Sequence, residues 1–170
     1  MDKGLVHLYW GKGKGKTTAA FGLAVRALGS GAQVTVVQFL KNGQSSELEP
    51  LRRLGVLVYS GRAGTKFFSQ MTEEEKRAIL ALHNEHLRQA LRQPCDLLIL
   101  DEACAACQYG MVDEKLLQQA VLQRPAGREV VLTGRTPAEW MCEAADYSSE
   151  IICHRHPYEK GITARKGVEF

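Results

Sequence analysis

Short apolar runs and amphipathic stretches alternate along the chain. The apolar runs are rich in Val, Ile and Leu, which is typical of strands that helices cover on both faces. Between them, apolar residues recur at the three- and four-residue spacing of helices. We therefore expect a three-layer α/β domain with a mainly parallel sheet. Its predicted strands are residues 5–9, 34–39, 56–59, 95–100 and 129–133, and a further strand that begins at 148 and includes Ile151 and Ile152.

Helix start and stop signals define the segments between these strands. Thr72 and Glu75 form a predicted capping box, which opens a helix of about twenty residues that a Gln-Pro pair ends. Leu80, Leu87 and Leu91 mark the face of this helix that we expect to be buried. The other predicted helices span residues 16–28, 47–54, 114–122 and 138–145, and a shorter one begins at 103.

Composition narrows the class of protein. The chain has 170 residues, 45% of them hydrophobic, which is enough for one domain spanning 1–170 with its own core. The net charge of +3 is spread along the sequence, which favours a small anionic ligand over nucleic acid. Five cysteines, an odd count, and the lack of a signal peptide indicate reduced thiols and a cytoplasmic protein. No apolar run approaches the ~20 residues that span a bilayer, so we expect no membrane partner.

The stretch from Trp10 to Thr18 carries the strongest chemical signal. A strand, a glycine-rich turn and a helix that opens on Gly-Lys-Thr form a phosphate-binding loop (P-loop), because backbone N–H groups and the helix N-terminus converge on anionic oxygens. Lys16 would bring positive charge to the phosphates and Thr17 a hydroxyl to Mg²⁺. The glycines can take positive φ and approach the ligand, although Trp10 replaces the motif's usual first glycine. The predicted nucleotide contacts are Gly11, Lys12, Gly13, Lys14, Gly15, Lys16, Thr17 and Thr18.

A second signal complements this loop. The apolar run 95–100 ends in Asp101 and Glu102, as in the Walker B element of P-loop proteins. We expect its strand to lie beside the first strand, so that these carboxylates and Thr17 hold Mg²⁺ or Mn²⁺. The two motifs together predict a P-loop NTPase (RecA-like) fold that binds Mg-ATP. This fold alone does not show whether the protein phosphorylates a substrate, hydrolyses ATP or acts as a nucleotide switch.

Four further side chains follow predicted strands and are candidate ligand contacts. Lys41 opens a polar loop at the carboxyl end of the second predicted strand, where α/β folds place ligands. Arg135 follows another strand and either stabilises phosphate charge or forms a structural salt bridge. Phe67 and Phe68 lie in a polar loop and are either packing anchors or ligand contacts.

Histidines and cysteines offer weaker signals. Cys104 and Cys107, with the segment 153–156 as a second half-site, suggest a metal or redox site, but small apolar side chains on a short helix are the favoured interpretation. His83 and His86 are three residues apart without a suitably spaced third ligand. We therefore expect a solvated or half-packed pair rather than a metal site.

From Leu5 to Phe170 the sequence resembles the P-loop type of ATP:corrinoid adenosyltransferase (cob(I)yrinic acid a,c-diamide adenosyltransferase). The motif at 11–22 is shared with many NTPases, whereas the C-terminal motifs are the most discriminating. The segments that carry the resemblance are 11–22, 37–41, 100–102, 133–135, 156–158, 161–164 and 167–170.

This resemblance implies a homodimeric enzyme that transfers the 5′-deoxyadenosyl group of ATP to the cobalt of a reduced corrinoid and releases triphosphate. In this family the nucleotide lies reversed in the loop, so that the phosphate chain is the leaving group. Cob(I)alamin is a strong nucleophile and needs no general base, so the protein must position C5′ and neutralise charge on the triphosphate. The resemblance assigns that neutralisation to Lys14, Lys16 and Arg135, with the metal.

The resemblance also assigns a corrinoid-facing role to an aromatic side chain of the 60–71 loop, here Phe67 or Phe68, which would displace the corrinoid's lower axial ligand. An electron donor such as a flavoprotein would reduce the cobalt. A small-molecule kinase and a non-catalytic switch or ATPase subunit are the alternative functions. Corrinoid-dependent release of intact triphosphate separates the three, since a kinase yields ADP and an ATPase yields phosphate.

Overall fold

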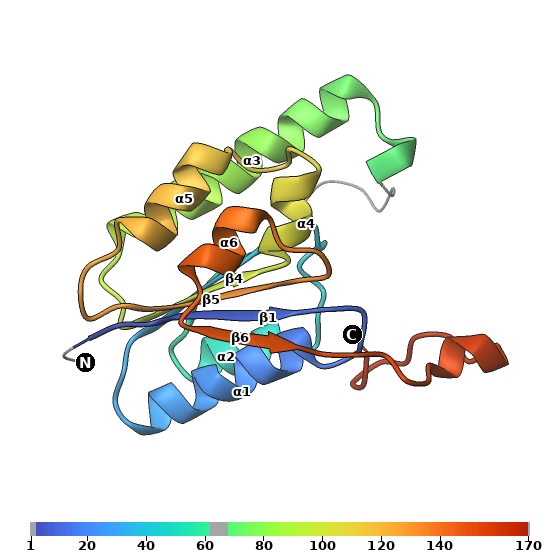
Figure 1. Ribbon diagram of the computed structural model, residues 1–170, viewed down its shortest axis with the longest axis horizontal. Coiled ribbons are helices and arrows are strands. Elements are labelled where there is room, and N and C mark those ends of the chain that lie inside the picture. The colour runs from blue at the N-terminus through green and yellow to red at the C-terminus, as the bar shows by residue number, and fades with distance from the viewer. Residues whose placement is uncertain (1–2, 62–67, 170) are drawn as a thin grey trace.

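Six parallel strands form a single sheet in the order β3-β2-β4-β5-β1-β6 (Figure 1). The computed structural model describes residues 3–61 and 68–169. The expected α/β class is confirmed, and the sheet is parallel throughout the described part. The strands are β1 Val6–Trp10, β2 Val34–Gln38, β3 Leu57–Tyr59, β4 Leu97–Asp101, β5 Glu129–Gly134 and β6 Tyr147–Glu150.

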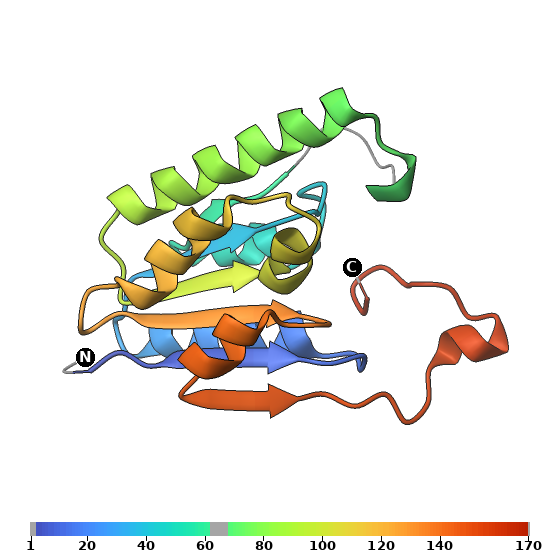
Figure 2. The same cartoon turned by 45° about the horizontal axis from the view of Figure 1, so that its top comes forward.

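Helices cover both faces of this sheet. Helices α1 and α2 pack on one face, and α3, α4, α5 and α6 lie over the other (Figures 1 and 2). The helices are α1 Lys16–Gly29, α2 Leu48–Arg53, α3 Glu73–Arg92, α4 Ala103–Gln108, α5 Glu114–Leu122 and α6 Glu139–Ala144, with 3₁₀ turns η1 Phe68–Gln70 and η2 Pro157–Lys160. No described helix is long and apolar enough to cross a membrane.

The alternation of strand side chains divides the core into two layers. In β4, Leu97 and Ile99 pack among the residues of α1 and α2, whereas Leu98 and Leu100 pack beneath α3, α4 and α5. All four are buried, because a strand covered on both faces has no solvent side. By the same alternation, the next residue, Asp101, belongs to the α1 face of the sheet.

The strand order corrects one expectation. Strand β5 lies between β1 and β4, so the strand that ends in Asp101 is not beside the P-loop strand. Helix α1 nevertheless crosses this part of the sheet and contacts β1, β5 and β4. The carboxylate of Asp101 can therefore meet the first turn of α1 without strand pairing between β4 and β1.

Helix α3 begins where its capping signal placed it. The Thr72 hydroxyl accepts a hydrogen bond from the Glu75 N–H, and the Glu75 carboxylate accepts one from the Thr72 N–H, so the predicted capping box is confirmed. Its buried face agrees only in part with the expected one, because Leu87 is confirmed as fully buried but the centre of the face lies elsewhere. Ile79, His83, Leu87 and Ala90 are buried, whereas Leu80 and Leu91 are only half-buried.

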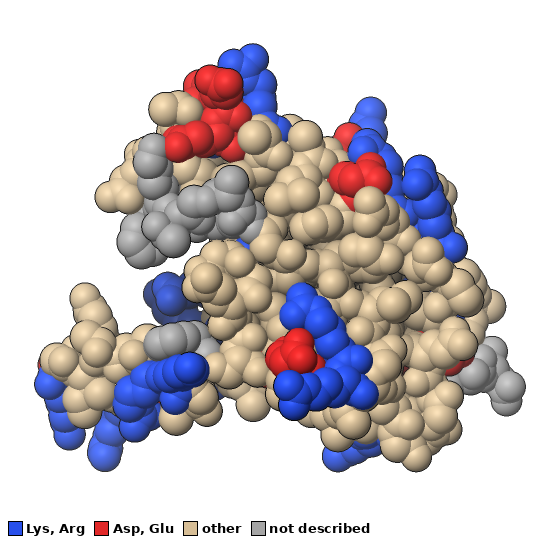
Figure 3. Space-filling model, turned by 180° about the vertical axis from the view of Figure 1, so that it is seen from behind, with Lys and Arg blue, Asp and Glu red and all other residues tan. Residues whose placement is uncertain are grey.

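The C-terminal part of the chain leaves the sheet early. Strand β6 ends at Glu150, so Ile151 and Ile152 follow the strand and are not part of it, contrary to expectation. Residues 151–169 form an arm that projects from the sheet and turns back toward the carboxyl end of β1 (Figure 2). Exposed Lys and Arg side chains gather on this arm (Figure 3).

Candidate nucleotide and corrinoid site

The glycine-rich loop between β1 and α1 has the backbone that an anion site requires. Gly15 caps α1 with φ of 124°, and Gly11 has φ of 110°, both values that favour glycine. The first N–H groups of α1 have no acceptor within the helix, so they are available to phosphate oxygens. The helix has no acidic residue in its first turn to compete for that position.

Close packing, rather than the expected positive φ, explains the glycine at position 13. It does not adopt positive φ, but a Cβ added to it would lie 2.8 Å from the side chain of Ile151. Its N–H donates to the Ile151 carbonyl at 2.7 Å, and the Ile151 N–H donates to the Trp10 carbonyl at 2.7 Å. The chain just after β6 thus packs directly against the P-loop backbone.

Polar side chains at the carboxyl ends of three adjacent strands meet beneath α1. Gln38, Asp101 and Thr133 each continue the side-chain alternation that buries the α1 face of β2, β4 and β5. The Asp101 carboxylate accepts hydrogen bonds from Thr133 Oγ1 at 2.7 Å and from Gln38 Nε2 at 3.1 Å. It also accepts one from Thr17 Oγ1, in the first turn of α1, at 2.7 Å. The carboxylate is fully buried.

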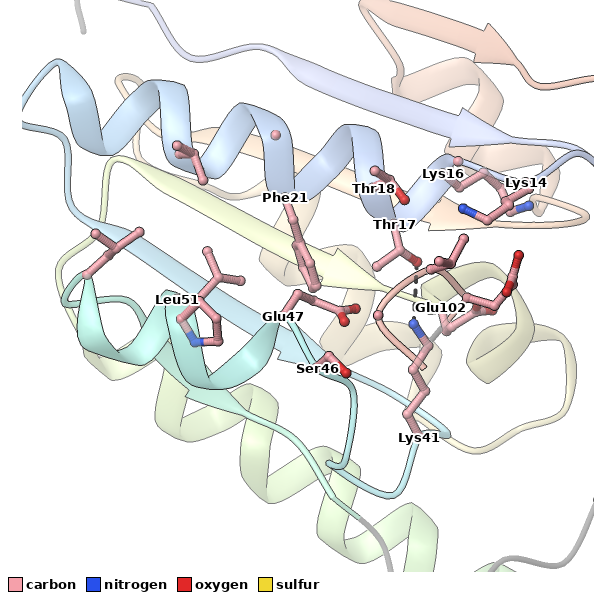
Figure 4. Close-up of a pocket in the computed structure, with 18 residues that line it drawn as sticks. Lys14, Lys16, Thr17, Thr18, Phe21, Lys41, Ser46, Glu47, Leu51 and Glu102 are labelled. Carbon is pink, nitrogen blue, oxygen red and sulfur yellow. Dashed lines mark hydrogen bonds between the residues drawn. The ribbon is translucent and has the colours of Figure 1, made fainter. Parts of the chain in front are cut away.

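Two lysines lie beside this cluster. Lys41 Nζ is 2.9 Å from Asp101 Oδ2 and 3.4 Å from Thr17 Oγ1 (Figure 4). Lys16 Nζ donates to the Gly13 carbonyl at 2.7 Å, so in this structure its ammonium is folded back on the loop. Partial burial lowers the pKa of Lys16, and the nearby charge of Arg135 acts in the same direction, whereas Glu102 opposes it.

These residues open onto a cleft of about 710 Å³, within the size range of small-molecule sites. One end is charged, with Lys14, Lys16 and Lys41 around it, and the other is apolar (Figure 4). The described residues that line it are Lys14, Gly15, Lys16, Thr17, Thr18, Phe21, Gly22, Val25, Lys41, Ser46, Glu47, Pro50, Leu51, Leu54, Glu102, Gly167, Val168 and Glu169. The C-terminal arm therefore forms one wall of the cleft.

Comparison with known proteins agrees with this geometry. The sequence model of a family described as ATP:corrinoid adenosyltransferase BtuR/CobO/CobP matches residues 2–170. The chain belongs to this family. It is 35% identical to a corrinoid adenosyltransferase of Pseudomonas aeruginosa over 99% of this chain and 85% of the relative. It is 33% identical to those of Escherichia coli K12 and Salmonella typhimurium, in each case over 99% of this chain and 87% of the relative.

In this corrinoid adenosyltransferase family member, the second Walker B carboxylate faces the cleft. Glu102 turns the chain from β4 into α4 with φ of 60°, and its N–H donates to Thr133 Oγ1 at 2.9 Å. Burial raises the pKa of Glu102, and the Asp101 charge adds to that rise, whereas Lys41, Lys16 and Arg135 oppose it. The two neighbouring carboxylates thus have different surroundings.

The remaining predicted phosphate ligands are placed unequally. Thr18 lines the cleft, whereas Lys12 is exposed and lies outside the lining. Arg135 is exposed, and its backbone carbonyl accepts the Gly11 N–H at 3.1 Å, which holds β5 against the P-loop. Arg135 does not line the cleft, but its positive charge acts to lower the pKa of both Lys16 and Glu102.

Of the two adjacent phenylalanines, Phe67 and Phe68, the structure describes only Phe68. Phe67 lies outside the described residues. Phe68 stacks on Tyr109 with ring centroids 4.8 Å apart, and Lys76 Nζ lies 4.6 Å from the centre of its ring. These contacts are those of a packing anchor between η1, α3 and the end of α4.

Cys104 and His83 are buried in the core, whereas Cys142, His154 and His156 are exposed. Cys104 packs against Gly134, where an added Cβ would lie 2.3 Å from the Cys104 Cβ, and burial raises the pKa of its thiol to about 12. Within residues 3–61 and 68–169, no group of three or more His, Cys, Asp or Glu residues is placed to hold a metal ion. His83 is fully buried, so the expected solvated or half-packed pair is wrong for it, and His86 is half-buried.

Sequence reasoning missed Gln38 and Thr133 as members of the site. A signal was present in the sequence. Each of the two is a polar residue at the end of an apolar strand, and each points to the same face of the sheet as the apolar residues that pack beneath α1. Gln38 continues the series of Val34 and Val36, and Thr133 follows Val131. Polar side chains at these positions are buried beside Asp101, and Gln38 is also held by Ser60, whose hydroxyl donates to Gln38 Oε1 at 2.8 Å.

Proposed function

We propose that this chain transfers the 5′-deoxyadenosyl group of ATP to the Co(I) centre of a reduced corrinoid and releases triphosphate. The observation that carries the proposal is that Lys16 and Thr17 line the charged end of the cleft while the buried Asp101 carboxylate accepts a hydrogen bond from Thr17. Relatives over nearly the whole chain are named corrinoid adenosyltransferases, which supports ATP and a corrinoid as the substrates.

The reaction is a displacement at C5′ of ATP. The electron pair of Co(I) forms the new Co–C5′ bond, and the C5′–O bond breaks with its electrons passing to the triphosphate. No proton is transferred at the reacting carbon, so the protein acts by alignment and by stabilising the leaving group. In our proposal Lys14, Lys16 and Arg135 supply the positive charge, and the N–H groups of the first turn of α1 bind the triphosphate. The N–H groups of Gly11 and Gly13 donate instead to the carbonyls of Arg135 and Ile151.

The polar cluster fits a divalent cation, Mg²⁺ or Mn²⁺, bound with ATP. The Thr17 hydroxyl donates to Asp101, which orients its oxygen as a ligand, while the buried Asp101 carboxylate is occupied by protein donors. We therefore assign Thr17 as a direct ligand and Asp101 as the group that orients it, with Glu102 acting at the edge of the cleft. When bound, the cation would neutralise charge on the phosphate chain.

The corrinoid is proposed to lie beyond the cleft, against the loop that carries Phe67 and Phe68. The anchoring of Phe68 by Tyr109 and Lys76 supports a structural role for that ring and leaves Phe67 as the better candidate for the lower face of the corrinoid. A homodimer, an electron donor such as a flavoprotein, and a cytoplasmic location are also proposals. These three proposals are inferred from membership of the corrinoid adenosyltransferase family.

An anaerobic assay tests the proposed reaction. Protein, Mg-ATP and chemically reduced cobalamin are mixed, and the Co(I) absorbance and the phosphate product are followed together. We expect loss of the Co(I) band with release of intact triphosphate, and we expect Lys16→Ala to abolish both. Lys115→Ala, an exposed lysine on α5, is the matched control and should react as the wild type does.

Other products would identify the alternatives. Formation of ADP with a small-molecule acceptor would indicate a kinase, and corrinoid-independent release of phosphate would indicate an ATPase. No reaction across several corrinoids, with ATP binding demonstrated, would overturn the proposal.

A further inference from the structure

The residue before Lys41 has an unusual backbone. Within the described part of the chain, Leu40 and Glu102 are the two non-glycine residues with positive φ, each at 60°. At Leu40 the chain makes a three-residue turn, closed by a hydrogen bond from the Lys41 N–H to the Phe39 carbonyl at 2.7 Å. Leucine adopts this conformation rarely, and such turns persist where the surroundings hold them.

His83 on α3 supplies that hold. Its Nε2 accepts a hydrogen bond from the Leu40 N–H at 3.2 Å, and its Nδ1 lies 2.8 Å from the Met111 carbonyl oxygen. A carbonyl only accepts and a backbone N–H only donates, so the imidazole must carry its hydrogen on Nδ1 and keep a lone pair on Nε2. The Phe39 ring meets the imidazole edge-on, with centroids 5.3 Å apart.

The turn at Leu40 decides where Lys41 points. From this turn the Lys41 ammonium reaches Asp101 at 2.9 Å and Thr17 at 3.4 Å, inside the nucleotide cleft. A relaxed backbone at Leu40 would redirect the following side chain, because φ and ψ of one residue set the direction of the next. The bond from Leu40 to His83 thus links the core under α3 to a cation of the site.

We propose that His83 is a positioning residue: by holding Leu40 in its left-handed turn, it places the Lys41 ammonium against Asp101 and Thr17 in the ATP site. This inference rests on the proposed ATP site but not on corrinoid chemistry. The imidazole is fully buried and does not line the cleft, so it acts through Leu40.

Two amide substitutions separate the two bonds of His83. In His83→Gln the side-chain oxygen can occupy the place of Nε2 and accept from Leu40, while the bond to Met111 is lost. In His83→Asn the amide nitrogen can replace Nδ1 as donor to Met111, while the acceptor for Leu40 is lost. Each variant therefore loses one of these two hydrogen bonds, and His83→Asn is the one that removes the acceptor for the Leu40 N–H.

Mg-ATP affinity, measured by calorimetry, is the readout that does not depend on adenosyl transfer. We expect His83→Asn to weaken binding about tenfold, the loss typical of one displaced charge-assisted contact, and His83→Gln to stay near the wild type. Lys41→Met should weaken binding at least as much, and adding His83→Asn to it should cause no further loss, because both changes remove the same contact.

His86→Asn is the matched control. His86 lies one turn along the same helix, and within the described chain its buried Nδ1 has no hydrogen-bond partner. It should bind Mg-ATP as the wild type does. Where adenosyl transfer is observed, the same ordering is expected in kcat/KM for ATP, with KM for the corrinoid unchanged.

The ¹⁵N chemical shifts of the His83 ring provide a test without substitution. We expect a protonated Nδ1 and an unprotonated Nε2 at pH 7. A protonated Nε2, additive losses in the double variant, or equal ATP affinities for His83→Asn and the wild type would each overturn the proposal. Failure of adenosyl transfer alone, with the expected order of ATP affinities, would overturn the proposed reaction and leave the role of His83 intact.

Discussion

Two adjacent carboxylates in this protein have opposite surroundings. Asp101 is fully buried and accepts hydrogen bonds from Thr17, Thr133, Gln38 and Lys41, so its negative charge is compensated on every side. Glu102 has no comparable set of donors on its side chain within the described residues, and burial acts against its charge. The contacts of Asp101 therefore stabilise the folded site, whereas burial of the charged Glu102 side chain lowers the free energy of unfolding.

Asp101→Asn should destabilise the fold. The amide group places two hydrogens where an oxygen now accepts, and the Lys41 ammonium loses its counter-ion. Lys41 is 29% exposed, so the main loss comes from buried donors left without an acceptor, which costs about 1–3 kcal/mol, and we expect a clear fall in the urea midpoint at pH 7. Glu143→Gln, an exposed carboxylate on α6, is the control and should leave the midpoint unchanged. An unchanged midpoint in Asp101→Asn would contradict the compensation argued from the contacts.

Glu102→Gln should stabilise the fold at neutral pH. The pKa of Glu102 is raised in the folded state from its ordinary value of 4.5, so the native protein keeps this proton to higher pH than the unfolded chain does. The free energy of unfolding therefore falls as pH rises through that interval, and the fall is complete above the folded pKa. In Glu102→Gln the side chain does not ionise, so this fall in the free energy of unfolding does not occur.

The measurement is urea unfolding of both proteins from pH 4 to pH 8. The variant's advantage should be small at pH 4, grow as pH rises and then become constant. A constant difference across the whole range would show that ionisation of Glu102 is not its cause. Adenosyl transfer should fall in the same variant, because the substitution removes a negative charge from the edge of the cleft.

At the scale of elements, sequence signals were reliable where the forces are local. The capping box of α3 was predictable because Thr72 and Glu75 satisfy each other's backbone groups within one turn. Its buried face was predictable only in part: Leu87 is buried as expected, but the tertiary contacts of α3 bury Ile79 and His83 more fully than Leu80. Similarly, the P-loop and both Walker B carboxylates follow from local motifs, but the partners Gln38 and Thr133 depend on strand order, which pairing between distant segments decides.

Helix α1 contains a glycine that its own stability does not require. Gly22 lies within the helix and lines the cleft, and a Cβ added to it would have no heavy atom within 4 Å apart from the surrounding backbone of α1. Glycine within a helix costs about 1 kcal/mol relative to alanine, so Gly22→Ala should stabilise the free protein by roughly 0.5–1 kcal/mol.

The same substitution should weaken substrate binding, since the new methyl group enters the cleft. Gly29→Ala, in the last turn of α1 with equally open space, is the control and should leave binding unchanged because it does not line the cleft. Thermal unfolding and Mg-ATP titration of the two variants provide the comparison. Unchanged binding in Gly22→Ala would show that bound substrate leaves this part of the cleft empty.

At the scale of the whole molecule, the site draws on both ends of the sequence. The cleft joins the P-loop at 11–18 with α2 and with the arm at 167–169. Mg-ATP should therefore stabilise the entire fold by mass action, by about 2.7 kcal/mol when its free concentration is 100 times Kd. The urea midpoint should rise with ATP in the wild type and in Lys115→Ala, but not in Lys16→Ala. An equal rise in Lys16→Ala would place the nucleotide elsewhere.

The contact between Gly13 and Ile151 also bears on how the molecule assembles. The P-loop takes its final form against a carbonyl group that lies far along the chain, just after the last strand of the sheet. A chain that has formed β1 and α1 but has not yet docked β6 would hold the motif without the shape that binds phosphate. Pairing between distant segments is slow, because a long chain loop must close before the contact forms. We therefore expect nucleotide to act on the final folding step, so that ATP slows unfolding and leaves the early stages of folding unchanged.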